Sequence, residues 1–136
     1  MRKGARSDNV RTTNNWRNVR LYTIKHSTRT FDELVTLLRA FDISILADIR
    51  TVPRSHHNPQ FNRDALRSKL RSRKLRYVHL PELGGLRRPR ADSPNTGWRN
   101  ASFRGFADYM LTEPFERGLT NLRDLAGDGV AALMCA

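Results

Sequence analysis

The chain has 136 residues, 38% of them apolar, and a formal net charge of +12. This length predicts one domain, and no run approaches the ~18–20 consecutive apolar residues of a membrane-spanning helix. One cysteine cannot form an internal disulfide, and the Arg- and Asn-rich start lacks the apolar segment of a secretory signal, so we expect a cytoplasmic protein.

The basic charge is concentrated in two segments. Residues 1–20 hold six basic residues and one acidic residue, and residues 50–104 hold fourteen basic and three acidic residues. Most of the basic residues are Arg, whose planar guanidinium makes forked contacts with phosphate. Such an excess indicates a polyanionic partner, either nucleic acid or a phosphorylated small molecule. The alternative explanation is a solvated surface shaped by the Arg codons of a GC-rich genome.

The first part of the chain changes character near residue 19. Residues 1–18 have no apolar period, and we expect a flexible basic lead there. One domain is predicted over residues 19–136, beginning with a strand at residues 19–24. Thr30 and Glu33 then form a capping-box pattern, which predicts the start of a helix with apolar residues on one face.

The middle of the chain continues the alternation. Residues 43–49 form a second predicted strand, apolar on both faces as in the middle of a parallel sheet. Asn62 is expected to cap the next helix, and residues 77–80 follow that helix as a third strand. The outer face of the helix carries five basic residues: Arg63, Arg67, Arg71, Arg73 and Lys74.

The last third contains a long polar loop at residues 81–102 and a helical region at about 103–126, broken near Glu113-Pro114. Val130 begins a fourth predicted strand. This order of strands and helices predicts an α/β fold, a three-layer sandwich around a mostly parallel four-stranded sheet.

Polar side chains follow each predicted strand. The carboxyl ends of parallel strands lie at one edge of a sheet, where ligands bind in open α/β folds. We therefore predict a catalytic set of four residues. His26 would be the acid/base group, Asp48 would orient it, and Glu82 would be a second carboxylate. Cys135 would be a nucleophile if neighbouring cations lowered its pKa.

The same edge carries candidate phosphate-binding residues. Ser27, Arg50 and Arg54 follow the first two strands and are predicted to hold the anion. Further along the chain, Arg99 and Arg104 are interleaved with the aromatic residues Trp98 and Phe103, a pattern that could stack and clamp a base or nucleotide. Packing of the two aromatic rings onto the core is the more frequent alternative.

Each catalytic candidate also has a structural alternative. His26 could cap the following helix, and Glu82 could stabilise a turn before Gly-Gly. Asp48 would be costly to bury without a partner, and Arg50 or His26 could serve as that partner. Cys135 could be an inert, buried small residue.

No cofactor and no metal site are predicted. The chain has no glycine fingerprint for a dinucleotide. His56 and His57 lack further ligands at a plausible spacing.

Five ordered segments carry a family resemblance. They are residues 22–27 (YTIKHS), 48–55 (DIRTVPRS), 58–62 (NPQFN), 77–85 (YVHLPELGG) and 133–136 (LMCA). Together they resemble the domain of unknown function 488 family (DUF488) from about residue 20 onward. The resemblance implies an α/β sandwich and leaves the reaction open.

The chain departs from the family pattern in two ways. Lys25 stands where the family usually has glycine, so either this turn differs or the crevice gains a cation. The family pattern continues past Met-Cys-Ala with an acidic residue and a Cys-His-Arg group, which this sequence lacks. We therefore expect a C-terminally truncated chain without its last helix, marginally stable alone, with an uncovered sheet face through which a homodimer could form.

These observations lead to two predicted functions and one further alternative. The first is an enzyme-type site for a phosphate-bearing substrate, a nucleotide or nucleic acid, at the carboxyl ends of the strands. The second is a non-catalytic nucleic-acid-binding module that uses the Arg-rich helix face and residues 87–90, and its binding should weaken steeply with salt. The third is an inactive truncated remnant.

Overall fold

The computed structural model describes residue 16 and residues 19–135, so apart from Trp16 the predicted flexible lead lies outside the described residues. Four strands form one sheet: β1 (Leu21–Lys25), β2 (Ile45–Asp48), β3 (Arg76–His79) and β4 (Ala131–Cys135). Their order is β1-β4-β2-β3, and each neighbouring pair is parallel. The predicted α/β fold with a parallel four-stranded sheet is confirmed.

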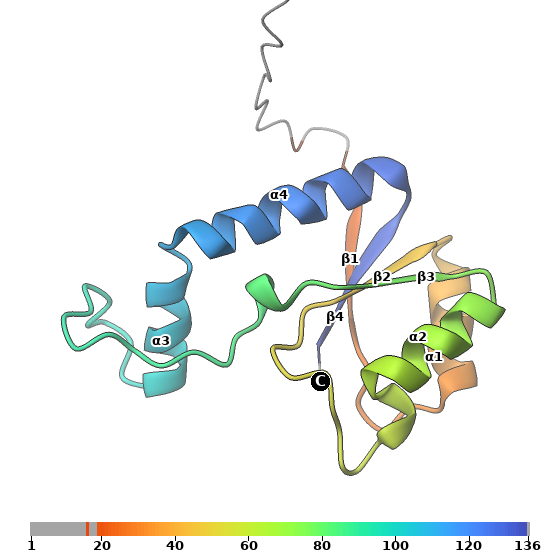
Figure 1. Cartoon of the computed structure of the whole chain (residues 1–136), viewed down its shortest axis with the longest axis horizontal. Helices are drawn as coiled ribbons and strands as arrows, with labels where there is room; N and C mark the ends of the chain where they lie inside the picture. Colours follow the sequence, from red (N-terminus) through yellow and green to blue (C-terminus); the bar gives the residue numbers. More distant parts are fainter. Residues whose placement is uncertain (1–15, 17–18, 136) are drawn as a thin grey trace, which may run out of the picture.

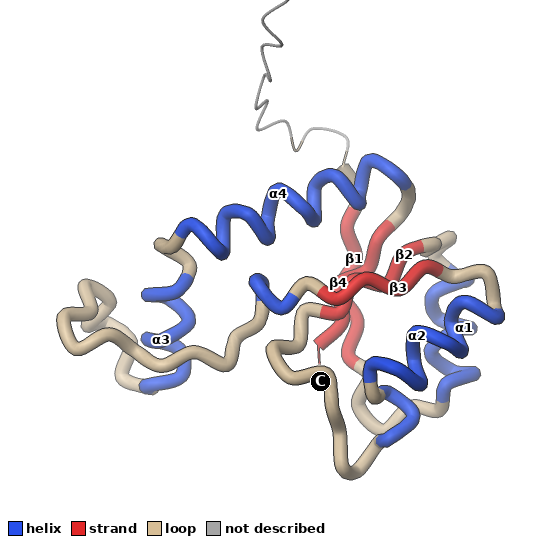
Figure 2. Tube along the Cα trace, in the orientation of Figure 1, coloured by secondary structure: helices blue, strands red, loops and turns tan. Residues whose placement is uncertain are grey.

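Helices pack on both faces of the sheet, which gives the predicted three layers (Figures 1 and 2). The helices α1 (Phe31–Ala40) and α2 (Arg63–Ser72) pack on one face, and α4 (Glu113–Asp128) packs on the other. The remaining helix, α3 (Ala101–Tyr109), lies to the side of the sheet, next to the start of α4 (Figure 1).

The strand β2 is buried along its whole length, as its continuously apolar sequence predicts. Its side chains alternate between the two cores. Leu46 packs in the core formed with α1 and α2, whereas Ile45 and Ala47 pack in the core formed with α4. Asp48, the last residue of the strand, follows the alternation and lies on the α1/α2 side with its partner Tyr77.

The two predicted helix starts have different outcomes. The capping box of α1 is present, because Thr30 Oγ1 accepts from the Glu33 amide at 3.1 Å and Glu33 Oε2 accepts from the Thr30 amide at 3.3 Å. Asn62 occupies the N-cap position of α2, but its side chain makes no capping hydrogen bond. Its Oδ1 instead accepts from the Ser55 amide at 2.7 Å, which ties the preceding loop to the start of the helix.

The region after β3 is more ordered than a long polar loop. A 3₁₀ turn, η2 (Pro81–Leu83), follows the strand directly, and α3 begins at Ala101. The predicted helical region is divided at residues 110–112, and Pro114 lies in the first turn of α4, where the missing N–H of proline breaks no helical hydrogen bond.

Gly84 provides a test of the packing between η2 and the segment after β2. A Cβ atom at Gly84 would meet the Thr51 side chain, the Thr51 amide nitrogen at 2.8 Å and the Ile49 carbonyl oxygen at 2.9 Å. We expect Gly84→Ala to lower the free energy of unfolding by about 1–3 kcal/mol, as overpacked sites do. The matched control is Gly85→Ala, since nothing lies within 4 Å of a Cβ there. Equal urea midpoints for the two variants would contradict this close approach.

Candidate functional site

A buried ion pair lies at the carboxyl end of β2. The Asp48 carboxylate is fully buried, at 0% exposure. Arg50 donates to it from Nε at 2.9 Å, from Nη2 at 2.8 Å and from its backbone amide at 3.1 Å. The Tyr77 hydroxyl donates to Asp48 Oδ2 at 2.5 Å from the neighbouring strand. Of the two partners predicted for Asp48, the structure therefore selects Arg50.

The environment of this ion pair keeps Tyr77 and Arg50 protonated. Burial raises the pKa of Tyr77, and the hydrogen bond to Asp48 raises it further, so the phenol stays protonated. Burial by itself lowers the pKa of Arg50, but the hydrogen bonds and negative charge of Asp48 outweigh burial, and the net shift is upward. Arg50 is therefore a permanent cation at this position.

Arg50 has a structural role inside the protein and is not a surface residue that could bind an anion. Besides Asp48, its Nη2 donates to the Phe61 carbonyl at 2.6 Å. Its Nη1 is buried and has no hydrogen-bond partner among the described residues. With 8% of its surface exposed, the guanidinium does not present a free fork to a phosphate at the sheet edge.

His26 follows β1 and lies on the same face as the ion pair. Its ring stacks on Phe61 with a centroid distance of 4.8 Å, and its Nδ1 lies 3.0 Å from the Ser27 carbonyl. A carbonyl only accepts, so Nδ1 is the donor in this contact, and the tautomer that it selects has its lone pair on Nε2. Nε2 makes no hydrogen bond to any residue that the structure describes. Ser27 and Phe61 hold this ring, whereas the predicted orienting residue, Asp48, is bonded to Arg50 and Tyr77.

The structure shows the effect of having Lys25 at the position where the family usually has glycine. Lys25 is the last residue of β1, pairs with Cys135, and does not have a positive φ. The left-handed residue of this turn is Ser27, with a φ of 45°. Lys25 is exposed, so it adds a cation to this edge without altering the turn itself.

Glu82 and Cys135 belong to the opposite face of the sheet. Glu82 lies in η2, where its Cβ would be 3.0 Å from a Cβ placed at Gly118 of α4, and it lines a surface cavity with Glu113, Glu116 and Arg117. Cys135 has the same parity along β4 as Leu133, which packs in the α4 core. The backbone amide of His26 donates to the Cys135 carbonyl at 3.2 Å, but strand alternation points the two side chains to different faces. The predicted catalytic set is thus divided between two faces.

The predicted phosphate-binding residues also fall into separate groups. Ser27 and Arg54 are exposed on the loops after β1 and β2. Arg99 is exposed in the loop before α3, and Arg104 lies on α3, where its Nη1 donates to the Trp98 carbonyl at 3.3 Å. The elements that carry Arg99 and Arg104 lie beside the sheet (Figure 1).

Two polar residues of β3 were missed by sequence reasoning. Tyr77 completes the hydrogen bonding of Asp48, and His79 Nε2 lies 2.7 Å from the Arg50 carbonyl. The register pairs Asp48 with His79, and Tyr77 lies two residues before His79 on β3. Tyr77 and His79 therefore both border the ion pair. A sequence signal for this site exists: a Tyr and a His stand at alternate positions of one strand, and a neighbouring strand ends in an Asp. The signal can be recognised only when β2 and β3 are known to be neighbours.

A groove lined by cations runs between α2 and the sheet edge at β3. Its cavity measures about 450 Å³, and six residues line it: Arg67, Arg71, Lys74, Leu75, Arg76 and Tyr77. No carboxylate is among them. Arg76 forms a long 3.4 Å ion pair with Asp128, while Arg67, Arg71 and Lys74 form no ion pair with a described residue. Three of the five basic residues predicted for the outer helix face thus converge on one cavity.

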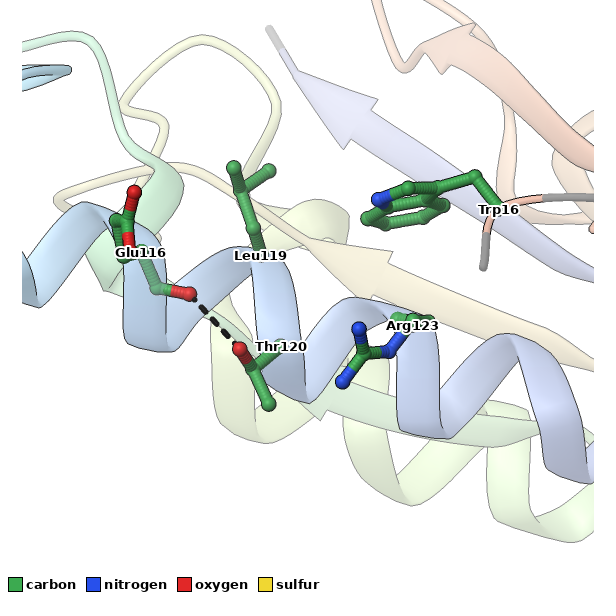
Figure 3. A pocket seen from close by; sticks show the side chains of 5 residues that line it. All are labelled: Trp16, Glu116, Leu119, Thr120 and Arg123. Carbon is green, nitrogen blue, oxygen red and sulfur yellow. Dashed lines mark hydrogen bonds between the residues drawn. The ribbon is translucent and has the colours of Figure 1, made fainter. Parts of the chain in front are cut away.

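A second cavity, of about 240 Å³, lies over α4 and differs in character. Trp16, Glu116, Leu119, Thr120 and Arg123 line it, and the Thr120 hydroxyl donates to the Glu116 carbonyl at 3.1 Å (Figure 3). Its charges are mixed, and it contains none of the predicted site residues. In the part of the chain that the structure describes, no helix has the length and apolarity to cross a membrane.

The ion pair generates a stability prediction. Asp48→Asn removes the negative charge and leaves the Arg50 cation buried without compensation, so we expect a loss of about 3–5 kcal/mol. Tyr77→Phe removes one hydrogen bond and keeps the charge pair, so about 1–2 kcal/mol is expected. Urea unfolding followed by circular dichroism measures both. If Asp48→Asn were no less stable than Tyr77→Phe, the buried charge of Arg50 would not be the dominant cost.

The comparisons with known proteins give one match. The family model described as "Domain of unknown function DUF488" matches residues 30–136. No curated protein and no solved structure matches the chain. The match spans α1 to β4, and with it the ion pair, the cation-lined groove and most of the candidate site residues. The resemblance seen in the sequence motifs is confirmed, and the chain belongs to the DUF488 family.

Proposed function

We propose that this protein binds the phosphate backbone of nucleic acid in the groove between α2 and β3. The observation that carries the proposal is the convergence of four cations on one cavity of about 450 Å³, with no carboxylate among the described residues that line it. Like charges that share a concave surface repel one another, and the concavity focuses their field onto whatever anion enters. A polyanion relieves that repulsion and releases its own counterions when it binds.

The positions of the cations support this proposal. Arg67 and Arg71 are one helical turn apart and lie on the same face of α2. Lys74 follows the helix with a φ of 59°, a left-handed residue that turns the chain from α2 towards Arg76 at the start of β3. The cations therefore come from a helix, a turn and a strand, and they border one cavity. Arginines scattered over a solvated surface would not have this arrangement.

The groove is also joined to the ion pair in the core. Tyr77 forms part of the groove lining, and its hydroxyl donates to Asp48. This partly buried hydrogen bond thus fixes the position of one wall. A fixed wall reduces the side-chain ordering that binding must otherwise bring about.

Salt dependence distinguishes a phosphate-binding groove from general positive charge. Fluorescence anisotropy of a labelled oligonucleotide, from ~50 to ~200 mM KCl, should give a linear fall of log K with log salt. Arg67→Gln/Arg71→Gln should lower the affinity and reduce the slope by about 2, one for each lost phosphate contact.

The control variant is Arg39→Gln/Arg117→Gln, which makes the same change in net charge outside the groove. Arg39 lies in the last turn of α1, and Arg117 is already paired with Glu113 on α4. If the two double variants lose affinity equally, or if the wild-type protein fails to bind at ~50 mM salt, the groove is not a nucleic-acid site.

A second candidate function is an enzyme-type site for a phosphate-bearing substrate at the carboxyl edge of the sheet. The specific observation in its favour is His26, whose ring is held by Ser27 and Phe61 and whose Nε2 has no partner among the described residues. In this proposal Nε2 accepts the proton of an attacking water or hydroxyl as a general base. Ser27 and Arg54, exposed on adjacent loops, would contact the phosphate.

His26→Gln tests this second candidate on a panel of phosphate esters and oligonucleotides. Loss of a general base predicts turnover about 10²–10⁴-fold lower. The control is His56→Gln, because His56 is an exposed histidine in the loop after β2. Thermal unfolding of both variants checks that loss of the Phe61 stack has not unfolded the protein. Wild-type turnover by a folded His26→Gln protein would exclude His26 as the base.

A further inference from the structure

Two large aromatic side chains project from the loop before α3 and from its first turn. Trp98 is 52% exposed and Phe103 is 60% exposed, and their rings meet edge to face with centroids 5.7 Å apart. This exposure excludes packing of the two rings onto the core, which is the structural alternative for these residues. A tryptophan and a phenylalanine in contact with each other and open to solvent form a surface on which a flat apolar ligand can stack.

The loop that presents Trp98 is fixed at its beginning. Asp108 of α3 is buried and accepts hydrogen bonds from three groups of the loop: the Arg90 amide at 2.8 Å, the Ser93 hydroxyl at 2.5 Å and Asn95 Nδ2 at 2.7 Å. The bonds from Ser93 and Asn95 lower the pKa of Asp108, so the carboxylate is ionised at neutral pH.

The loop is also fixed at its end. Asn100 caps α3, with Oδ1 accepting from the amides of Ser102 at 2.9 Å and Phe103 at 3.2 Å. The Trp98 amide donates to the Asn95 carbonyl at 3.2 Å, which closes the turn between the two anchors. The aromatic pair is thus held in place before any ligand binds, and a preorganised surface loses less conformational entropy on binding.

The helix beneath the pair is itself docked on the preceding segment. A Cβ at Gly105 would collide with the Arg87 carbonyl, so the helix backbone lies directly against residues 87–88. Arg87 stacks over Tyr109 with its guanidinium carbon 3.7 Å from the ring centroid and donates to the Pro81 carbonyl at 2.8 Å. These contacts connect α3 to η2 and hence to the sheet.

The charge around the pair identifies the ligand chemistry. Between Ser93 and Thr112 the acidic residue present is Asp108, which is buried and fully engaged, whereas Arg99 and Arg104 flank the two rings. The centre of a protein–protein interface is usually depleted of charge. Aromatic rings interleaved with arginines match a ligand that offers a flat ring beside an anionic group, which is a nucleotide unit.

We propose that Trp98 and Phe103 form a stacking platform for a base of single-stranded nucleic acid, with Arg99 and Arg104 placed beside its phosphates. This inference rests on the proposed nucleic-acid function for its ligand class, and it specifies the single-stranded form. Bases inside a duplex are stacked on one another and cannot lie on a protein ring, whereas unpaired bases can. The groove at α2 would then contribute sequence-independent phosphate contacts, and the platform would distinguish single strands from duplexes.

Tryptophan fluorescence provides a direct test, because the chain has two tryptophans. In a Trp16→Phe background the emission comes from Trp98. Titration with an oligothymidylate of about 16 nucleotides, the upper end of site sizes for single-strand modules, should quench this emission. Trp98→Ala should weaken single-strand binding about 5- to 150-fold, the equivalent of one stacked base, and leave duplex binding nearly unchanged. Trp98→Phe should retain most of the affinity.

The outcomes separate this inference from the proposed function. If Arg67→Gln/Arg71→Gln weakens binding while Trp98→Ala changes neither single-strand nor duplex affinity, the platform is wrong and the groove stands. If Trp98→Ala alone weakens single-strand binding, the platform stands without the groove. Quenching of Trp98 by self-association, detected as a concentration-dependent sedimentation coefficient without oligonucleotide, would identify the exposed rings as a protein interface and overturn the platform.

Discussion

The buried pair of Asp48 and Arg50 is the interaction on which the rest of this edge of the molecule depends. A carboxylate at the end of a strand buried on both faces is tolerated only with a cation and further donors around it. Arg50 meets that requirement and also donates to the carbonyl of Phe61, whose ring supports His26. Tyr77 adds a bond from β3. The turn after β1, the end of β2, the middle of β3 and the 3₁₀ turn η1 (Pro59–Phe61) are therefore connected through this ion pair.

In this arrangement the polar groups that stabilise the fold are different from the polar groups that remain free to contact a ligand. At the carboxyl edge most strong donors are already used internally, which leaves His26 Nε2 and a few exposed loop residues for chemistry. Arg67, Arg71 and Lys74, which form no ion pair with a described residue, are on the outside, along α2 and the turn that follows it. Tyr77 belongs to both regions, with its hydroxyl on Asp48 and its ring in the groove lining. The protein thus combines a hydrogen-bonded polar centre with a positively charged groove on its exterior.

The sequence predicts the elements well and their spatial relations less well. Continuous apolar runs identify the strands, and the Thr30–Glu33 pair identifies the start of α1, because these signals are local. The Asp48–Arg50 pair is also local, and the sequence offers Arg50 as one of two possible partners, the other being His26. The sequence does not predict that Glu82 and Cys135 are separated from His26, because this separation depends on the face to which each side chain points at the strand ends. The role of Tyr77 depends on which strands are neighbours in the sheet, and local sequence patterns do not show the strand order.

The strand order has a consequence for how this chain reaches its native state. The first strand, β1, pairs with β4 and with no other described strand, so its partner is synthesised more than a hundred residues later. The β2-α2-β3 unit has local contacts and can assemble early, whereas β1 must await the insertion of β4 between itself and β2. Until then the apolar edge of β2 is open to pairing with another chain. Productive folding therefore depends on a late, long-range closure, and the interval before it is the period of greatest exposure to aggregation.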